Sequence, residues 1–320
     1  MTDTNVDTLV GIVLKNENMK IVEIESSGGD QFRINKITEE KLDIPFVAET
    51  IKDGSYVSDF ADKIANVLDK HGFSTEHAIL TVPNDMLVIK KYPYDNDFSD
   101  EEIIDQVDWE VKQFSYSPDD EYVIDFGKLT HSRATEHNEL VVVAVRKAVV
   151  GFIKEVFTRA NVKLRVVDAE VFAAIRAINK NYEARDGDVT ALINIEQQGI
   201  QFIIIDSGEF FTSYQIPLQF KPDDPENSKT ETIIKMTSKE LKRIIIDHKL
   251  GEKIEDLSRI FLFGDLVLDP VLETLQNSYN VRIDRANPFR RLRFAPNVSV
   301  DEYIWSRPET FTICVGCALR

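Results

Sequence analysis

Two segments of the sequence, 181 residues apart, share one pattern. Residues 10–24 read VGIVLKNENMKIVEI and residues 191–205 read ALINIEQQGIQFIII. In both segments an apolar run leads into a short polar stretch and then into a second run rich in β-branched residues. This order is typical of a β-hairpin with a tight turn, and its repetition indicates an internal duplication. We therefore expect two lobes, each beginning with a hairpin.

Predicted strands and helices alternate in both halves. An amphipathic helix around residues 60–68 precedes a strand at 78–82, and Ser99 and Glu102 form a capping box at the start of the next helix. A buried strand is expected at 139–145 and a helix at 147–160. In the second half we expect an exposed loop at 219–229 and a helix at 239–249. This alternation favours an α/β fold with helices packed on sheets.

Charge and hydropathy exclude several classes of protein. The 320 residues include 55 acidic and 38 basic side chains, and the net charge of −17 opposes binding to nucleic acid or to anionic lipid. There is no run of about 18 apolar residues that would cross a bilayer. The first residues, MTDTNVDT, lack the features of a secretion signal. We expect a cytoplasmic protein.

Cysteine and histidine supply no clear site. Cys314 and Cys317 form one C-x-x-C, but no second pair at ligand spacing completes a tetrahedral zinc site. The five histidines form neither a metal motif nor a visible triad. We therefore expect no metal and no catalytic residue, and a packing role for the two cysteines.

The order of several motifs resembles the PilM proteins of type IV pilus assembly, members of the actin-like superfamily related to the cell-division protein FtsA. The resemblance covers nearly the whole chain, and its motifs are MKIVEI from Met19, DWEVKQF from Asp108, SPDD from Ser117, VIDF from Val123, VAVRKAVV from Val143, VVDAEVFA from Val166, ANPF from Ala286 and VGCALR from Val315. It implies a bilobal actin-like (ribonuclease H-like) fold with an inserted small α+β subdomain. The implied parts are 1–83 and 162–188 for the first lobe, 84–161 for the insertion and 189–320 for the second lobe.

The resemblance implies a nucleotide cleft whose motifs are degenerate here. Relatives hold ATP and Mg²⁺ with two turns that contain Asp and Gly and with a Gly-rich adenosine loop, because phosphate needs open backbone N–H groups. The matching positions in this chain are Gly11, Val13, Lys15, Lys20, Asn194, Glu196, Gly264 and Asp265. Loss of the aspartates removes ligands for the ion that would neutralise a triphosphate. Lys15 is read either as a phosphate contact or as a solvated turn residue. We expect a pseudo-ATPase without a cofactor; the alternative is an active actin-like ATPase or filament protein with Mg·ATP.

The resemblance also implies a partner. A PilM-like protein binds the short cytoplasmic tail of a PilN-like membrane protein in a groove between the first lobe and the insertion. This makes the chain a non-catalytic adaptor that is peripheral to the inner membrane. The candidate partner-binding residues are Trp109, Phe114, Tyr116, Arg146 and Lys147. The three aromatic residues have a second interpretation as the core of the insertion, and Arg146 and Lys147 have a second interpretation as a solvated helix start.

Two further hypotheses remain open. Arg285, Arg290, Arg291 and Arg293 form a basic cluster that would either dock an assembly ATPase or a membrane, or lie solvated in a loop. The chain is also compatible with the cytoplasmic domain of a GspL-type secretion protein.

Overall fold

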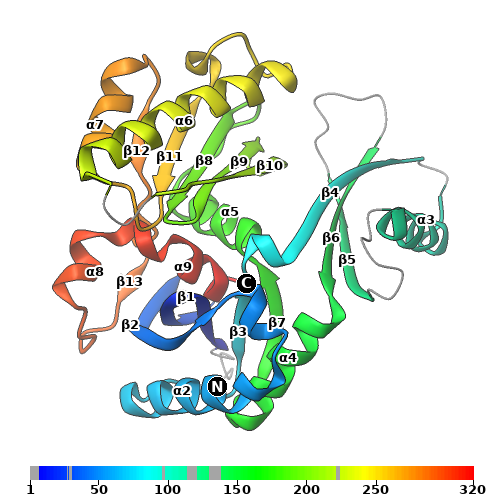
Figure 1. Cartoon of the computed structure of the whole chain (residues 1–320), viewed down its shortest axis with the longest axis vertical. Helices are drawn as coiled ribbons and strands as arrows, with labels where there is room; N and C mark the ends of the chain where they lie inside the picture. Colours follow the sequence, from blue (N-terminus) through cyan, green and yellow to red (C-terminus); the bar gives the residue numbers. More distant parts are fainter. Residues whose placement is uncertain are drawn as a thin grey trace. The chain divides into compact units, whose positions relative to one another are not determined.

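The computed structural model describes residues 7–26, 28, 31–95, 98–113, 121–129, 138–220 and 224–320. The chain forms two compact units, the first of residues 1–173, 292–300 and 317–320 and the second of residues 174–291 and 301–316. Both units are mixed α/β structures (Figure 1). The first unit therefore includes two C-terminal segments, which the sequence analysis assigned to the second lobe.

The main sheet of the first unit has the strand order β13-β2-β1-β3-β7. Its strands are β1 (Asp7–Ser26), β2 (Phe32–Phe46), β3 (Ala78–Val82), β7 (Leu164–Ala169) and β13 (Arg293–Phe294). Its helices include α1 (Ala48–Ile51), α2 (Val57–His71) and α4 (Lys147–Arg159). The buried faces of α2 and α4 share one core with the inward residues of β1 and β3.

The first predicted hairpin is present as the single long strand β1. Residues 10–13 of β1 pair with β3 in parallel, and residues 16–26 pair with β2 in antiparallel. The register with β2 shifts between Asn16 and Asn18, and Asn16 has a left-handed backbone with φ of 51°. The expected turn coincides with a change of partner strand, since the residues of β1 before it pair with β3 and those from Asn16 onward pair with β2.

The insertion is a small sheet with its own core. Strands β4 (Leu87–Tyr94), β6 (Asn138–Arg146) and β5 (Tyr122–Lys128) lie in the order β4-β6-β5, and α3 (Asp100–Gln113) packs on one face of this sheet. Helix α4, which we placed with the insertion, packs instead in the core of the main sheet. The apolar side of α4 meets α2 there, so the small sheet and α3 form their core without it.

The second unit contains the second hairpin as predicted. Strands β8 (Val189–Glu196) and β9 (Gly199–Asp206) pair in antiparallel from Val189↔Asp206 to Glu196↔Gly199, which leaves a two-residue turn. The sheet has the order β10-β9-β8-β11-β12, with β10 (Glu209–Pro217), β11 (Arg259–Phe263) and β12 (Ile283–Arg285). Helices α6 (Glu226–Asp247) and α7 (Asp269–Ser278) pack on it around one apolar core.

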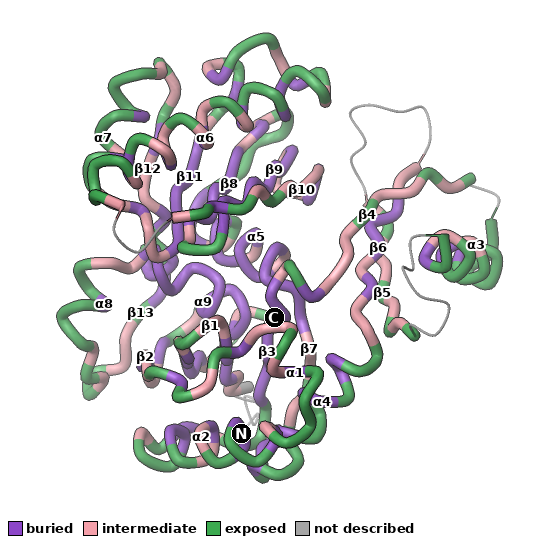
Figure 2. The backbone as a smooth tube through the Cα atoms, in the orientation of Figure 1, coloured by how far each residue is buried: buried purple, intermediate pink, exposed green. Residues whose placement is uncertain are grey.

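The remaining helices are α5 (Glu170–Asn181), α8 (Glu302–Ser306) and α9 (Thr312–Ala318), with short 3-10 turns η1 (Gly54–Tyr56), η2 (Asn84–Met86), η3 (Ile254–Asp256) and η4 (Pro308–Phe311). Figure 2 shows that strand interiors are buried while the outer sides of the helices are exposed. Within the described part of the chain, no helix combines the length and the apolarity that crossing a bilayer requires.

Candidate functional site

In the first unit, the positions of the first phosphate turn lie inside the sheet. Gly11 and Val13 belong to β1 and pair with Ile79 and Thr81 of β3. The Val13 side chain is 6% exposed and belongs to the core. A valine side chain supplies no oxygen ligand, so this position does not hold a cation.

Lys15 follows in the same strand and is ion-paired inside its own unit. Its Nζ lies 2.9 Å from Oε2 of Glu170, whose side chain is fully buried. The same carboxylate oxygen accepts a hydrogen bond of 3.1 Å from Nδ2 of Asn84. The Lys15 ammonium therefore compensates a buried carboxylate, a role that neither sequence interpretation of Lys15 included.

Asp168, two residues before Glu170, forms a second ion pair. Arg320 Nη1 donates to Oδ1 of Asp168 at 2.9 Å, and the Asp168 side chain is almost completely buried. Lys20 is buried and lies 3.8 Å from Glu39. Sequence reasoning missed Glu170, Asp168 and Arg320 as partners. The signal was the pair of acidic residues at and directly after the carboxyl end of β7, where a buried charge needs a counter-ion.

In the second unit, the residues of the second turn bind one another. Asn194 is buried, and its Nδ2 donates to Oε1 of Glu196 at 2.9 Å. Gly264 has φ of 101°, and a Cβ atom on it would lie 2.3 Å from Asn194 Oδ1 and 2.6 Å from the Ile195 carbonyl oxygen. Only glycine fits at position 264, because Asn194 and Ile195 approach its backbone too closely for a side chain.

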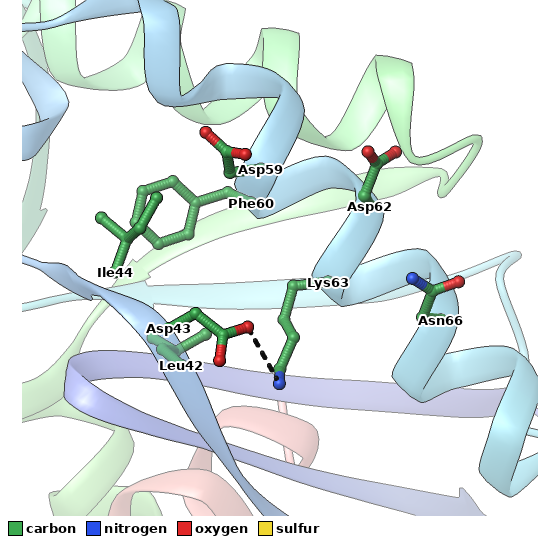
Figure 3. Close-up of a pocket in the computed structure, with 8 residues that line it drawn as sticks. All are labelled: Leu42, Asp43, Ile44, Asp59, Phe60, Asp62, Lys63 and Asn66. Carbon is green, nitrogen blue, oxygen red and sulfur yellow. Dashed lines mark ion pairs between the residues drawn. The ribbon is translucent and has the colours of Figure 1, made fainter.

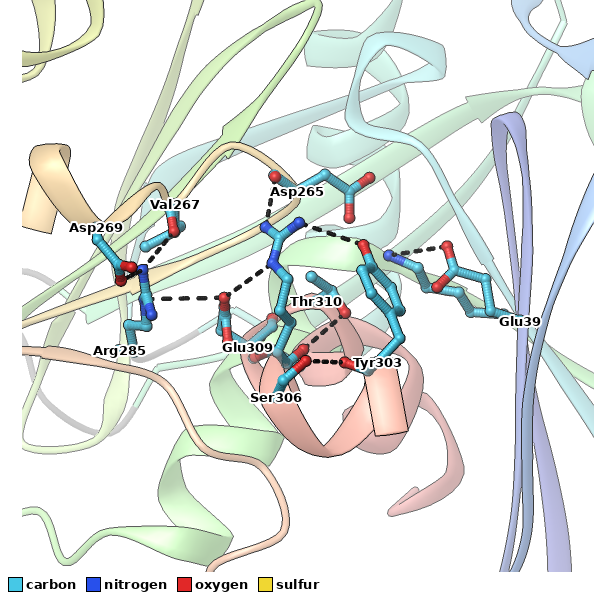
Figure 4. A network of polar contacts seen from close by, with 12 residues as sticks. Glu39, Asp265, Val267, Asp269, Arg285, Tyr303, Ser306, Glu309 and Thr310 are labelled. Atoms are coloured by element: carbon cyan, nitrogen blue, oxygen red, sulfur yellow. Dashed lines mark hydrogen bonds and ion pairs between the residues drawn. The ribbon is translucent and has the colours of Figure 1, made fainter. Parts of the chain in front are cut away.

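Asp265 is fixed through its backbone. Arg307 donates from Nη2 to the Asp265 carbonyl at 2.6 Å and lies with Nε 3.6 Å from Oε1 of Glu309 (Figure 4). Glu309 is fully buried, and Arg285 Nε lies 3.9 Å from the same oxygen. Arg285 also donates to Asp269 Oδ1 at 2.6 Å. Arg307 and Arg285, which flank this buried carboxylate and donate to the Asp265 and Val267 carbonyl oxygens, therefore hold the segment that would be the adenosine loop.

The groups present in each unit do not match what Mg²⁺ and a triphosphate need. Mg²⁺ binds through carboxylates and retained waters, and phosphate binds through open N–H groups and unengaged cations. Val13 offers no ligand, Lys15 is paired, and Glu196 adds negative charge. Among the described residues there is also no group of three or more His, Cys, Asp or Glu side chains placed to hold a metal ion.

The small sheet presents two different faces. Residues opposite one another in the register share a face, so Leu140, Val142 and Ala144 face α3 and its buried residues Ile103, Val107 and Val111. The opposite face carries the apolar residues Leu87, Ile89, Val123, Val141, Val143 and Val145, together with the charged residues Lys91, Asp125 and Glu139. On this face Val123 is 44% exposed, and Ile89 and Val143 are half-buried. We call it the apolar sheet face.

The structure separates the partner-binding candidates. Arg146 ends β6 and pairs with Tyr122, and the Lys147 ammonium lies 2.8 Å from Glu121. Trp109 lies on α3, is 60% exposed and is not part of the core of the insertion, so its interpretation as a core aromatic is wrong. It does not lie on the apolar sheet face. Phe114 and Tyr116 lie outside the described residues.

The basic cluster is divided between the two units, with Arg293 in the first, and the three arginines in the second unit are engaged there. Arg291 lies 2.5 Å from Glu183, and the Arg290 guanidinium stacks over Tyr182 at 5.0 Å. Arg285 forms the contacts described above, and Arg293 belongs to β13. These contacts agree with a structural role for the arginines. Cys314 and Cys317 are buried, and Cys317 Sγ lies 3.3 Å from the Ile79 carbonyl oxygen.

A pocket of about 240 Å³ lies between β2 and α2 in the first unit (Figure 3). Among its lining residues, Lys63 Nζ lies 3.5 Å from Asp43 Oδ2, and Ile44 and Phe60 contribute apolar surface. None of its lining residues is one of the candidate site residues from the sequence. The pocket therefore does not correspond to the expected nucleotide site.

Comparison with known structures defines the class of fold. Over 90% of this chain and 95% of the other, the structure matches a Bacteroides thetaiotaomicron protein of unknown function with an actin-like ATPase fold, at 12% identity and a TM-score of 0.50. It matches the structure of a PilM-PilN type IV pilus biogenesis complex over 98% of both chains, at 17% identity and a TM-score of 0.77. The cytoplasmic domain of EpsL, an inner membrane component of the type II secretion system of Vibrio cholerae, matches at 9% identity and a TM-score of 0.49, over 98% of this chain and 95% of that chain. The fold is actin-like.

The family is defined by sequence. The model of the type IV pilus assembly protein PilM matches residues 11–215. The chain belongs to the PilM family.

Proposed function

We propose that this protein is a non-catalytic adaptor of a type IV pilus inner-membrane platform and that it binds the cytoplasmic tail of a PilN-like membrane protein. The observation that carries the proposal is the match of 98% of the chain to a PilM-PilN complex, together with its membership of the PilM family. On this proposal the protein acts on the cytoplasmic side and reaches the membrane only through its partner.

The absence of catalysis is supported by the chemistry of the two degenerate turns. The Lys15 ammonium is paired with Glu170, and Asn194 and Glu196 bind each other. A nucleotide would have to break these contacts and bring Mg²⁺ to positions without a suitable carboxylate. For an actin-like fold with these two degenerate turns, the simplest function is to bind a partner without the help of a nucleotide.

The apolar sheet face is the part of the insertion that suits an extended tail. Val123, Ile89 and Val143 offer apolar contact, and the tail of a membrane protein carries basic residues on the cytoplasmic side. A net charge of −17 favours encounter with such a tail. We expect micromolar affinity, because an extended tail loses conformational freedom when it binds.

The test is calorimetric titration of a PilN-like tail peptide into the full chain and into two lysine variants. Val123→Lys should weaken binding roughly fivefold or more, about 1 kcal/mol, because it places a cation in the apolar contact. Ile246→Lys is the matched control, since Ile246 on α6 is 49% exposed and the charge change is equal. Equal affinities for both variants would show that the tail does not bind at the apolar sheet face.

Nucleotide binding is tested separately by thermal unfolding with millimolar Mg·ATP. A ligand at about 100 times its Kd adds roughly 2.7 kcal/mol of stability, which raises Tm by several degrees. We expect no such rise. A clear rise would favour the alternative function, a nucleotide-binding actin-like ATPase.

A further inference from the structure

The outer side of α3 has an unusual composition for a surface helix. Its buried side, Ile103, Val107 and Val111, recurs at intervals of four and faces the small sheet. At 100° per residue, Asp105 and Trp109 lie opposite the buried stripe and Asp108 lies beside them, whereas Ile104 lies on the flank of the stripe, about 140° around the helix from Trp109. All four side chains are exposed. We call the side that carries Asp105, Asp108 and Trp109 the α3 outer face.

Two large apolar side chains of α3 remain in water. Trp109 is 60% exposed and Ile104 is 48% exposed. A tryptophan is among the most effective anchors of protein interfaces because one side chain buries a large area at small conformational cost. Neither side chain belongs to the core of the insertion, so folding of this subdomain does not explain them.

Most of the charge around them is negative, and the exception is the exposed Lys112, which lies on the same side of the helix as Asp108. The helix sequence DEEIIDQVDWEVKQ holds six acidic residues and one lysine. Glu102 serves the cap at Ser99 and Asp100 pairs with Lys128, while Asp105 and Asp108 lie exposed between Ile104 and Trp109. A partner that covers the side of the helix around Trp109 must neutralise these carboxylates and bury the indole.

We propose that the α3 outer face is a second docking surface, which takes a positively charged amphipathic segment of another protein. Lysine or arginine of the segment would pair with Asp105 and Asp108, and its apolar side would cover Trp109. An anionic membrane does not fit, because the carboxylates repel it. The surface lies on the opposite side of the small sheet from the apolar sheet face, so it is distinct from the tail site proposed above.

The sequence holds two tryptophans, which makes Trp109 a selective reporter. In a Trp305→Phe background, the emission of Trp109 is followed while the full chain is titrated with an 18-residue amphipathic Leu/Lys helix peptide. A peptide of the same composition, scrambled so that it has no apolar side, is the first control. We expect a saturable blue shift with the amphipathic peptide, at least tenfold weaker binding of the scrambled one, and an affinity that falls with added salt.

Charge reversal then tests the location. Asp105→Lys/Asp108→Lys should weaken binding of the amphipathic peptide at least tenfold. The control Asp59→Lys/Asp62→Lys makes the same change in net charge at two exposed positions of α2 and should leave the affinity within twofold. Circular dichroism checks that both variants remain folded.

Three results would overturn the proposal: equal weakening by both reversals, equal binding of the scrambled peptide, or binding seen by calorimetry without any change in Trp109 emission. None of them would affect the tail titration. Conversely, a failure of the tail to bind at the apolar sheet face would not contradict docking at the α3 outer face.

Discussion

Gly264 offers the sharpest test of how the degenerate adenosine loop is built. Replacing it by alanine adds a Cβ that would lie 2.3 Å from Asn194 Oδ1 and 2.6 Å from the Ile195 carbonyl oxygen. That carbonyl is held in place because it accepts a hydrogen bond of 3.0 Å from the Leu266 N–H. The backbone at φ of 101° adds strain for any side chain. We expect Gly264→Ala to lower the free energy of unfolding by about 3 kcal/mol or more, the sum of backbone strain and overpacking.

Gly208→Ala separates the two contributions. Gly208 lies in the same unit and has a positive φ of 86°, but the nearest atom to its added Cβ would be the Ala184 Cβ at 3.2 Å. It should therefore show backbone strain with little overpacking, about 1–2 kcal/mol. Asn194→Ala in the Gly264→Ala background should recover part of the loss, with a coupling of at least about 0.5 kcal/mol, because it removes the Oδ1 atom.

The assay is urea unfolding followed by the fluorescence of Trp305 in a Trp109→Phe background. Trp305 lies in the second unit and packs against Phe289 with ring centres 6.3 Å apart, so its emission reports on that unit. Equal losses for Gly264→Ala and Gly208→Ala would refute the reasoning, because close approach would then not be what requires the glycine.

Three further predictions concern charges. Glu309→Ala should cost about 3 kcal/mol in the same assay because it leaves two arginines without their buried carboxylate, whereas Glu183→Ala, at an exposed ion pair, should have little measurable effect. Lys15→Met should destabilise the first unit by about 3 kcal/mol, measured by calorimetric unfolding, because its buried carboxylate partner loses its cation. Hydrogen bonds, the largest from Lys70, hold the pKa of Glu40 below its usual 4.5; the stability this supplies is full above about pH 4.5 and is lost as pH falls through the lower folded pKa. The difference in stability between the native chain and Glu40→Gln should therefore shrink on acidification, and a difference independent of pH would contradict the assignment.

Local patterns were enough to predict much of the fold. The capping box forms as expected, with Ser99 N–H and hydroxyl both donating to Glu102, and α4 runs from Lys147 to Arg159 against an expected end at Ala160. The second hairpin keeps its predicted strands and turn. These features depend on residues that are close in sequence, so their periodicity and caps carry the information.

Contacts between distant residues were not accessible in this way. Lys15 and Glu170 are 155 residues apart, and although the position of Glu170 signals that it needs a cation, no local pattern identifies Lys15 as that cation. Helix α6 runs from Glu226 to Asp247, although we expected a loop at 219–229, because its long polar side dilutes the apolar spacing. The placement of α4 in the main core depends on its contact with α2, which spacing within one helix does not specify.

Trp109 shows the same limit at the candidate site. Its place in the insertion was predicted, but its direction depends on which side of α3 the small sheet buries. The buried residues Ile103, Val107 and Val111 recur at intervals of four, and that spacing places Trp109 outside the core. A helical projection of the sequence is therefore sufficient to predict that Trp109 lies outside the core.

The central claim is that this PilM-family protein binds its membrane partner without help from a nucleotide. The most direct measurement is calorimetric titration of the PilN-like tail into the full chain, with and without millimolar Mg·ATP. The account predicts one saturable micromolar binding event with the same affinity in both conditions. Binding that appears only with Mg·ATP, or no binding in either condition, would contradict it.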